Sequence, residues 1–144
     1  MILFVDIDHT ILNARWRDPM IGGEGGWDAY HTESSKDDPI DVIIKMISDL
    51  EKCDWETVGL TSRPEKWRQL TMNWLVRHDV PLDQLLMRPN DDYRESHVVK
   101  LDLIKNNFDQ SELENAILLD DRDDIVKAIH EMGIHCFHVY ARMT

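Results

Sequence analysis

The sequence has 144 residues and a formal net charge of −12, from 16 Lys and Arg against 28 Asp and Glu. Its length fits one globular domain over residues 1–144, and its composition, 42% hydrophobic and 31% charged, excludes a disordered tail and a disulfide-framed miniprotein. The acidic excess argues against a protein that coats long duplexes, although a few converging cations can still bind one phosphate group.

Short apolar runs alternate with segments of helical period along the chain. This alternation predicts an α/β fold, a Rossmann-like three-layer sandwich with a mainly parallel central sheet. The predicted strands are 2–5, 55–60, 85–87, 116–119 and 134–140, and the predicted helices are 39–50, 64–78, 96–108 and 123–132. Asp38 and Ser96 are the expected N-cap residues of their helices, and Gly133 is expected just after the last one.

The segment between the first strand and the first helix, residues 13–38, has no hydrophobic period. It contains four of the chain's six glycines, between positions 22 and 26. We expect a flap, or minimal cap, inserted after the first strand, because a long loop in a compact domain is usually functional. Its aromatic residues Trp16, Trp27 and Tyr30 either stack a base of a substrate or pin the flap to the body.

Polar residues follow four of the predicted strands at their C-terminal ends. These residues are Asp6 and Asp8, then Thr61 and Arg63, then Arg88, and finally Asp120 and Asp121. In a parallel sheet with right-handed crossovers all these ends lie at one edge, so the side chains converge. Several carboxylates in one place repel one another unless a cation intervenes, which predicts Mg²⁺. Together with a hydroxyl, an Arg and a Lys, the site is complementary to a phosphate.

One carboxylate of this group is free to attack phosphorus. Attack by Asp6 would form an aspartyl-phosphate, and Asp8, two residues later, is placed to protonate the leaving oxygen and then to activate water. The two acids therefore need opposite protonation states. We expect the metal to keep Asp6 ionised and the pKa of Asp8 to be raised.

Four motifs resemble those of the haloacid dehalogenase (HAD) superfamily of phosphatases. They are Asp6-Ile7-Asp8-His9-Thr10, Thr61-Ser62-Arg63, Lys100 and Asp120-Asp121, in the family's order. The resemblance implies Mg²⁺ as cofactor, Asp6 as nucleophile and Asp8 as general acid and base. It implies that Thr61 binds phosphate and that Lys100 pairs with the nucleophile; Thr10, Ser62 and Arg63 are further phosphate-binding candidates. The implied metal ligands are Asp6, Asp121, Asp120 and the backbone carbonyl of Asp8.

A narrower resemblance is to the 3′-phosphatase domain of phage polynucleotide kinase-phosphatase. It rests on Arg17, with Arg15 beside it, on Arg63, and on the segments 94–100 and 118–122. It implies removal of 3′-phosphates from polynucleotide ends, with Arg15 and Arg17 as phosphate-binding candidates. The sequence departs at Ser96 and His97, where that group tends to carry acids, and Asp91 or Asp92 could supply the missing carboxylate.

The resemblance implies a nucleotide or a nucleic-acid 3′-phosphate end as substrate. A flap of roughly 25 residues is too small to seal a metabolite from water, so we expect a site open to the end of a larger molecule or to a nucleotide. The alternatives are a nucleotidase for free mononucleotides and a phosphate-binding module without turnover. We expect a cytoplasmic protein with no membrane or obligate protein partner, since no apolar run approaches roughly 20 residues. Cys53 and Cys136 are expected to be buried without a chemical role, and His9 to serve backbone geometry.

Overall fold

The computed structural model describes residues 1–142, which form a central sheet with helices on both faces. The five strands of the sheet have the order β5-β4-β1-β6-β7, and every neighbouring pair is parallel. They are β1 (Ile2–Val5), β4 (Glu56–Pro64), β5 (Gln84–Arg88), β6 (Ala116–Asp120) and β7 (His135–His138). The predicted parallel sheet is confirmed.

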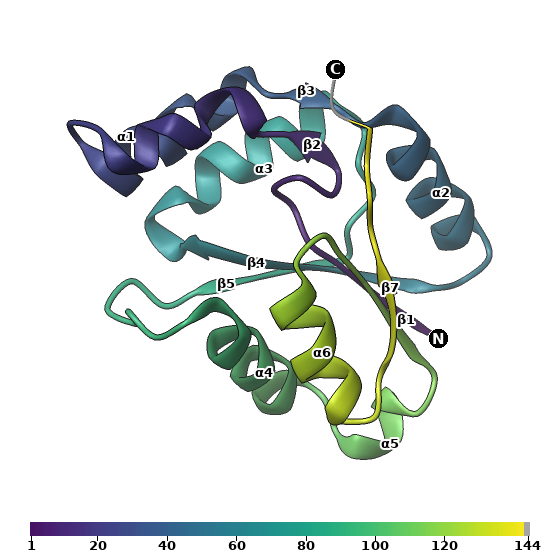
Figure 1. Cartoon of the computed structure of the whole chain (residues 1–144). Helices are drawn as coiled ribbons and strands as arrows, with labels where there is room; N and C mark the ends of the chain where they lie inside the picture. Colours follow the sequence, from purple (N-terminus) through teal and green to yellow (C-terminus); the bar gives the residue numbers. More distant parts are fainter. Residues whose placement is uncertain (143–144) are drawn as a thin grey trace.

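The helices form the two outer layers of the fold (Figure 1). On one face lie α2 (Asp41–Lys52) and α3 (Arg68–Arg77), and on the other lie α4 (Ser96–Asn107), the short α5 (Gln110–Leu113) and α6 (Asp123–Glu131). The predicted three-layer sandwich is therefore confirmed. Within residues 1–142, we find no helix with the length and apolar character needed to span a membrane.

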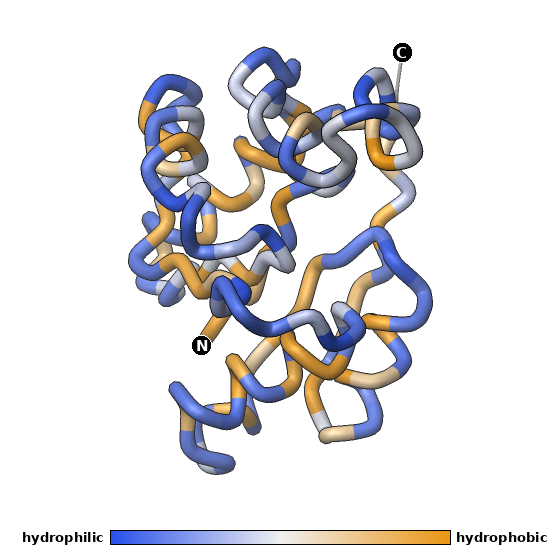
Figure 2. Tube along the Cα trace, turned by 90° about the vertical axis from the view of Figure 1, so that its left-hand side faces the viewer, coloured by the Kyte–Doolittle hydropathy of each residue, from blue (hydrophilic) through white to orange (hydrophobic). Residues whose placement is uncertain are grey.

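The strand β1 divides the hydrophobic core in two, because successive side chains of a strand point to opposite faces of the sheet. Leu3 and Val5 pack with the residues of α2 and α3, whereas Ile2 and Phe4 pack with those of α4 and α6. All four residues of β1 are buried, as expected for a central parallel strand. Figure 2 shows hydrophobic and hydrophilic positions alternating along the helical turns, the pattern of helices that bury one side.

The flap is a helical excursion between β1 and α2. Two short antiparallel strands, β2 (Leu12–Asn13) and β3 (Asp38–Pro39), close its base. Between them run the 3₁₀ helix η1 (Arg15–Gly22), the helix α1 (Gly26–Thr32) and the 3₁₀ helix η2 (Glu33–Lys36). The sequence predicts the limits of this insertion but not its helices, because each is too short to produce a hydrophobic period.

Several local predictions are wrong in detail. Asp38 lies in β3, where it pairs with β2, and Ile40 is the N-cap of α2. The helix predicted from residue 64 begins later, because β4 extends to Pro64 and a 3₁₀ turn, η3 (Glu65–Trp67), precedes α3. Ser96 is the first residue of α4 and Glu95 is its N-cap.

Two further residue predictions have opposite outcomes. The burial predicted for the cysteines is wrong, since Cys53 is exposed and Cys136 is half-buried. Gly133 follows the C-cap of α6 with a φ of 97°, a left-handed conformation that favours glycine, so its predicted place is confirmed.

Candidate active site

The C-terminal ends of β1, β4 and β6 lie at one edge of the sheet, where the helix α4 supplies a buried lysine. The Lys100 Nζ atom donates a hydrogen bond to Asp6 Oδ1 at 2.7 Å and another to Asp120 Oδ2 at 2.6 Å. All three side chains are buried. Although burial disfavours the charged lysine, the charges of Asp120 and Asp6 raise the pKa of Lys100 above its usual value, so the ammonium group stays protonated.

Three carboxylates converge beside this lysine. Asp6, Asp120 and Asp121 each offer one oxygen atom, and these atoms lie within 4.8 Å of one another. Burial, followed by the charge of Asp120, raises the pKa of Asp6 well above its usual value, and the same two causes raise the pKa of Asp121. Carboxylate oxygens around one point are the donors that Mg²⁺ prefers. These residues therefore fit the ion that the family implies.

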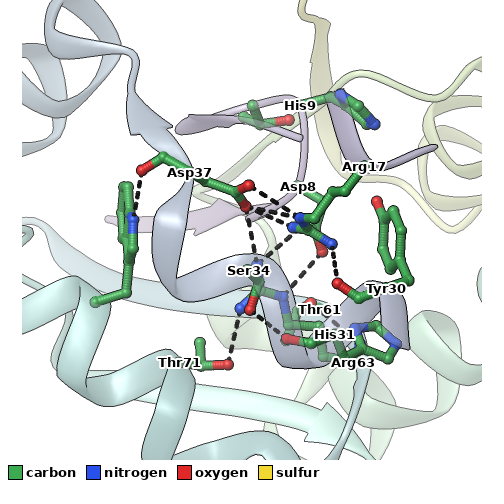
Figure 3. A network of polar contacts seen from close by, with 12 residues as sticks. Asp8, His9, Arg17, Tyr30, His31, Ser34, Asp37, Thr61, Arg63 and Thr71 are labelled. Atoms are coloured by element: carbon green, nitrogen blue, oxygen red, sulfur yellow. Dashed lines mark hydrogen bonds and ion pairs between the residues drawn. The ribbon is translucent and has the colours of Figure 1, made fainter. Parts of the chain in front are cut away.

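The carboxylate of Asp8 contacts two arginines (Figure 3). Arg63 donates from Nε to Asp8 Oδ2 at 3.0 Å and from Nη2 to Oδ1 at 2.8 Å, and Arg17 donates from Nη2 to Oδ1 at 2.5 Å. Burial by itself raises the pKa of Asp8, but the charges of Arg63 and Arg17 outweigh it and hold this pKa well below its usual range. The raised pKa predicted for Asp8 is therefore wrong, because two cations lie against its carboxylate.

Asp37 is the second carboxylate that binds Arg17 (Figure 3). Its carboxylate accepts hydrogen bonds from Arg17 Nε at 3.0 Å and from Arg17 Nη2 at 2.6 Å. It also accepts one from Trp16 Nε1 at 2.8 Å, and its backbone carbonyl accepts one from Trp74 Nε1 at 2.9 Å. Sequence analysis does not single out Asp37. A buried arginine requires a carboxylate partner, but the sequence contains 28 acids and the fold decides which one it meets.

Of the hydroxyl groups predicted to bind phosphate, one contacts Asp6 and two belong to residues that line the same cavity as Asp6. Thr10 Oγ1 donates to Asp6 Oδ2 at 3.0 Å. Thr61 is buried, lines the main cavity, and accepts the backbone N–H of Arg63 at 3.2 Å. Ser62 lines the same cavity, and its buried Oγ atom has no hydrogen-bond partner among residues 1–142. The Ser62 hydroxyl is therefore unpaired within the described chain but covered, and a ligand would have to displace its surroundings slightly to reach it.

The two flap arginines have different surroundings. Arg17 is fully buried behind Asp8 and is not among the described residues that line the main cavity. Arg15 is exposed and lines a smaller cavity of about 300 Å³ that also contains His9 and Asp121. His9 has a φ of 65°, so its predicted role in backbone geometry is confirmed.

The main cavity has a volume of about 940 Å³ and contains Asp6, Asp8 and Thr61. This is far more than one phosphate group needs, and it falls within the range of small-molecule sites. The helix α1 contributes Trp27 and His31 to its lining, and the loop between β5 and α4 contributes residues 90 and 92–95. A ligand that places a phosphate at Asp6 therefore has space for a nucleoside in the same cavity.

Arg88, which the sequence places at the end of a strand, holds this loop in position. It donates to the backbone oxygens of Ser62 at 2.9 Å and Asp92 at 3.0 Å, and to Ser96 Oγ at 3.3 Å. Asp92, a candidate for the acid missing at position 96, pairs with Arg94 at 2.7 Å, and hydrogen bonds from Arg94 lower the pKa of Asp92 to about 2.

Comparisons with known proteins identify the family and the fold of this chain. Residues 1–142 match the family model described as the polynucleotide kinase PNKP phosphatase domain. No curated protein matches the sequence. The fold is similar to that of "Structure of the Pnkp1/Rnl/Hen1 RNA repair complex", with a TM-score of 0.82 and 23% identity over 95% of this chain and 41% of that chain.

Two other solved structures share the fold. "Structure of Pnkp1/Rnl/Hen1 complex" has a TM-score of 0.82 and 23% identity over 98% of this chain and 46% of that chain. An uncharacterized protein from Corynebacterium glutamicum has a TM-score of 0.53 and 16% identity, with 96% of this chain and 84% of that chain covered. The present chain thus spans less than half the length of the two repair-complex chains.

Proposed function

The chain belongs to the family of polynucleotide kinase PNKP phosphatase domains, and from this premise we propose that it removes 3′-phosphates from polynucleotide ends. It is a phosphatase of the HAD superfamily. One observation supports the proposal most strongly. The carboxylate of Asp6, hydrogen-bonded to Lys100 and Thr10, lies in a cavity with space for a nucleotide.

The proposed binding of the phosphate uses groups on both sides of Asp6. Mg²⁺, held by Asp6, Asp120 and Asp121 and by the Asp8 backbone carbonyl, would supply positive charge beside the phosphate oxygens. Thr61 and Ser62 donate hydrogen bonds from their hydroxyls, and Ser62 Oγ has no competing partner among the described residues. Lys100 fixes the orientation of the Asp6 carboxylate and adds a second cation.

The proposed reaction has two steps. An oxygen of Asp6 attacks phosphorus, the bond between phosphorus and the 3′ oxygen breaks, and Asp8 gives a proton to the departing oxygen. A water molecule then attacks the phosphorus of the aspartyl-phosphate while Asp8 takes a proton from that water. The bond between Asp6 and phosphorus breaks, which releases inorganic phosphate and restores Asp6. Asp8 must take up a proton before the first step, although two arginines hold it ionised.

We propose that Arg63 relieves this restraint. Arg63 lines the cavity and contacts Asp8, so the phosphate oxygens can accept its hydrogen bonds in place of Asp8. Arg17 stays bound to Asp37 and positions Asp8 from behind. Arg15, exposed at the smaller cavity, is placed for a phosphate farther along a polynucleotide.

A free mononucleotide is the second candidate substrate. The observation that favours it is the net charge of −12, which repels a long polyanion more strongly than a short one. The deep cavity is consistent with either substrate, since both place one nucleotide beside Asp6.

Rates of phosphate release distinguish these substrates. Protein with Mg²⁺ is given oligonucleotides with a 3′- or a 5′-phosphate and free 3′- and 5′-mononucleotides. We expect the highest kcat/KM for the 3′-phosphorylated oligonucleotide and no release by Asp6→Asn. The control is Asp38→Asn, which changes an exposed acid of β3. A higher kcat/KM for a free mononucleotide would contradict the proposed polynucleotide substrate. Phosphate release by Asp6→Asn would exclude the covalent intermediate on Asp6.

A further inference from the structure

The structure separates the three aromatic residues of the flap that are candidates for base stacking. Tyr30 is 4% exposed, and the Arg17 guanidinium carbon lies 4.0 Å from its ring centroid (Figure 3). Trp16 donates to Asp37 and is not among the described residues that line the main cavity. Trp27 is 59% exposed and lines that cavity. Tyr30, although it also lines the cavity, is part of the buried core beside α3 and so pins the flap to the body. Trp16 joins two segments of the flap through Asp37, and Trp27 has a different role.

The indole ring of Trp27 rests on buried aromatic neighbours. Its centroid lies 5.8 Å from that of His31, with an angle of 23° between the two planes, and 5.4 Å from that of Tyr30 in an edge contact. His31 and Tyr30 are both buried. One face of the indole is thus stacked on a ring that packing holds in place, while the residue stays 59% exposed and lines the cavity.

The helix that carries this ring also contacts a second segment that lines the cavity. Asp28, the residue after Trp27, forms an ion pair of 2.7 Å with Lys66 of η3. Lys66 follows the end of β4, where Thr61 and Arg63 lie. The flap helix that presents Trp27 is therefore tied to the segment that presents the phosphate-binding side chains.

A large exposed indole on a supported stack is suited to an aromatic ligand. A further ring on its free face would bury apolar surface and retain favourable stacking geometry. Nucleobases stack on protein aromatic rings whatever their sequence, since each base has a π-face. The cavity that contains Trp27 also contains the proposed nucleophile Asp6, so both groups face the same space.

We propose that Trp27 stacks on the base of the nucleotide whose phosphate is removed. This inference rests on the proposed function and adds to it a binding site for the base. The site accepts any of the bases, because a flat indole offers no hydrogen-bond pattern that would distinguish them. Recognition then depends on the presence of a base at the end rather than on its identity.

The proposal is tested by comparing wild-type protein with Trp27 variants on substrates with and without a terminal base. The kcat/KM is measured for two 3′-phosphorylated oligonucleotides of equal length, one with a base and one abasic at the terminal nucleotide. We expect the wild-type protein to prefer the base-containing end by about 5- to 150-fold. Trp27→Phe should keep most of this preference, and Trp27→Ala should reduce it to less than about 2-fold.

Two controls distinguish the loss of stacking from a general loss of catalytic activity. Phe137→Ala removes a ring of β7 that is 58% exposed, matching Trp27, and should leave the preference unchanged. Hydrolysis of glycerol 2-phosphate, which has no ring, should fall less in Trp27→Ala than hydrolysis of the base-containing oligonucleotide does. An undiminished base preference in Trp27→Ala overturns the proposal, and so does an equal loss of activity on glycerol 2-phosphate.

Failure of the proposed function gives a different result. In that case the wild-type protein hydrolyses glycerol 2-phosphate but releases no phosphate from either oligonucleotide. The same comparison is then made between a nucleoside 3′-monophosphate and the corresponding sugar phosphate without a base. A preference for the nucleotide that Trp27→Ala removes supports stacking on a free nucleotide, and its retention in Trp27→Ala overturns stacking.

Discussion

At the scale of single residues, Asp8 lies between the buried arginines Arg63 and Arg17. Asp37 binds Arg17 in turn, so the four side chains form a row of alternating charges. Arg17 and Arg63 are each no more than 1% exposed, so neither charge is compensated by water. Buried charges are tolerated when they are paired and hydrogen-bonded, and removal of one partner leaves the other uncompensated. The row therefore fixes the position of Asp8 but makes the site sensitive to the loss of any member.

We predict that Asp37→Asn lowers the free energy of unfolding by about 2 to 4 kcal/mol, because Arg17 loses one of its two charged partners in a buried setting. Urea unfolding at pH 7 measures the change. Asp38→Asn, one residue later and exposed, is the matched control and should change stability by less than about 0.5 kcal/mol. Equal effects of the two substitutions would contradict the prediction.

A single residue, His31, makes the stability of the protein depend on pH. Burial lowers its pKa to about 4 in the folded protein, whereas an unfolded histidine has a pKa of about 6.5. Between these values the unfolded chain binds a proton that the folded chain does not, so stability falls as the pH decreases. From pH 7 to pH 5 the wild-type protein should lose about 2 kcal/mol more than His31→Gln.

Urea unfolding at the two pH values measures this difference for His31. The control is His135→Gln, which changes an exposed histidine of β7 and should lose as much stability as the wild type. Parallel losses in the wild type and His31→Gln would show that His31 is not the responsible group.

At the scale of elements, the flap is bound to the body through its C-terminal half. The side chain of Trp74 on α3 donates to the Asp37 carbonyl at 2.9 Å, and Arg77 Nη1 donates to the Ser35 carbonyl at 3.1 Å. Ser34 of η2 is buried. The loop between β5 and α4, on the other side of the cavity, is mostly exposed at residues 89–95. The two walls of the cavity should therefore differ in local stability.

Hydrogen exchange measures this difference. Without substrate, we expect the backbone amides of residues 30–37 to exchange more slowly than those of residues 89–95, because buried side chains hold the former. Asp37→Asn should speed exchange across residues 14–37 and leave α5 unchanged. Equal exchange on both walls, or an equal effect of Asp37→Asn on α5, would contradict a flap anchored through Asp37.

At the scale of the whole molecule, the sheet gathers chemical groups from both ends of the chain. Asp6 follows the first strand and Asp120 ends the fourth of the central sheet, yet β1 and β6 are neighbours in that sheet. The carboxylates that meet there repel one another, and Lys100 offsets part of this repulsion. A divalent cation would offset more of it, so its binding should stabilise the folded state.

We therefore expect Mg²⁺ to raise the midpoint of thermal unfolding. At 100 times its Kd, an ion that binds only the folded protein stabilises it by about 2.7 kcal/mol. Excess EDTA should reverse the shift, and Asp121→Asn should abolish it. The control is Asp123→Asn, an exposed acid that pairs with Lys127 and lies outside the carboxylate cluster. An unchanged shift in Asp121→Asn would place the ion elsewhere.

The sequence by itself determined the architecture and which polar side chains gather at one edge of the sheet. The alternation of strand and helix patterns predicts the parallel sheet, and the polar residues after each strand predict which side chains meet at its edge. The absence of a period predicts the limits of the flap. These properties are visible in the sequence because they are local: a period extends over one element, and each strand end carries its own polar residues.

Only the tertiary structure decided which buried charges pair and which aromatic ring stays exposed. Asp8 meets an arginine that lies 55 positions later in the chain, and Arg17 meets Asp37, which no motif distinguishes. Tyr30 is buried while Trp27 is exposed, although they are three residues apart in the same helix. These outcomes depend on distances between separate elements after packing, because the energy of a charge or a ring is set by its neighbours in space.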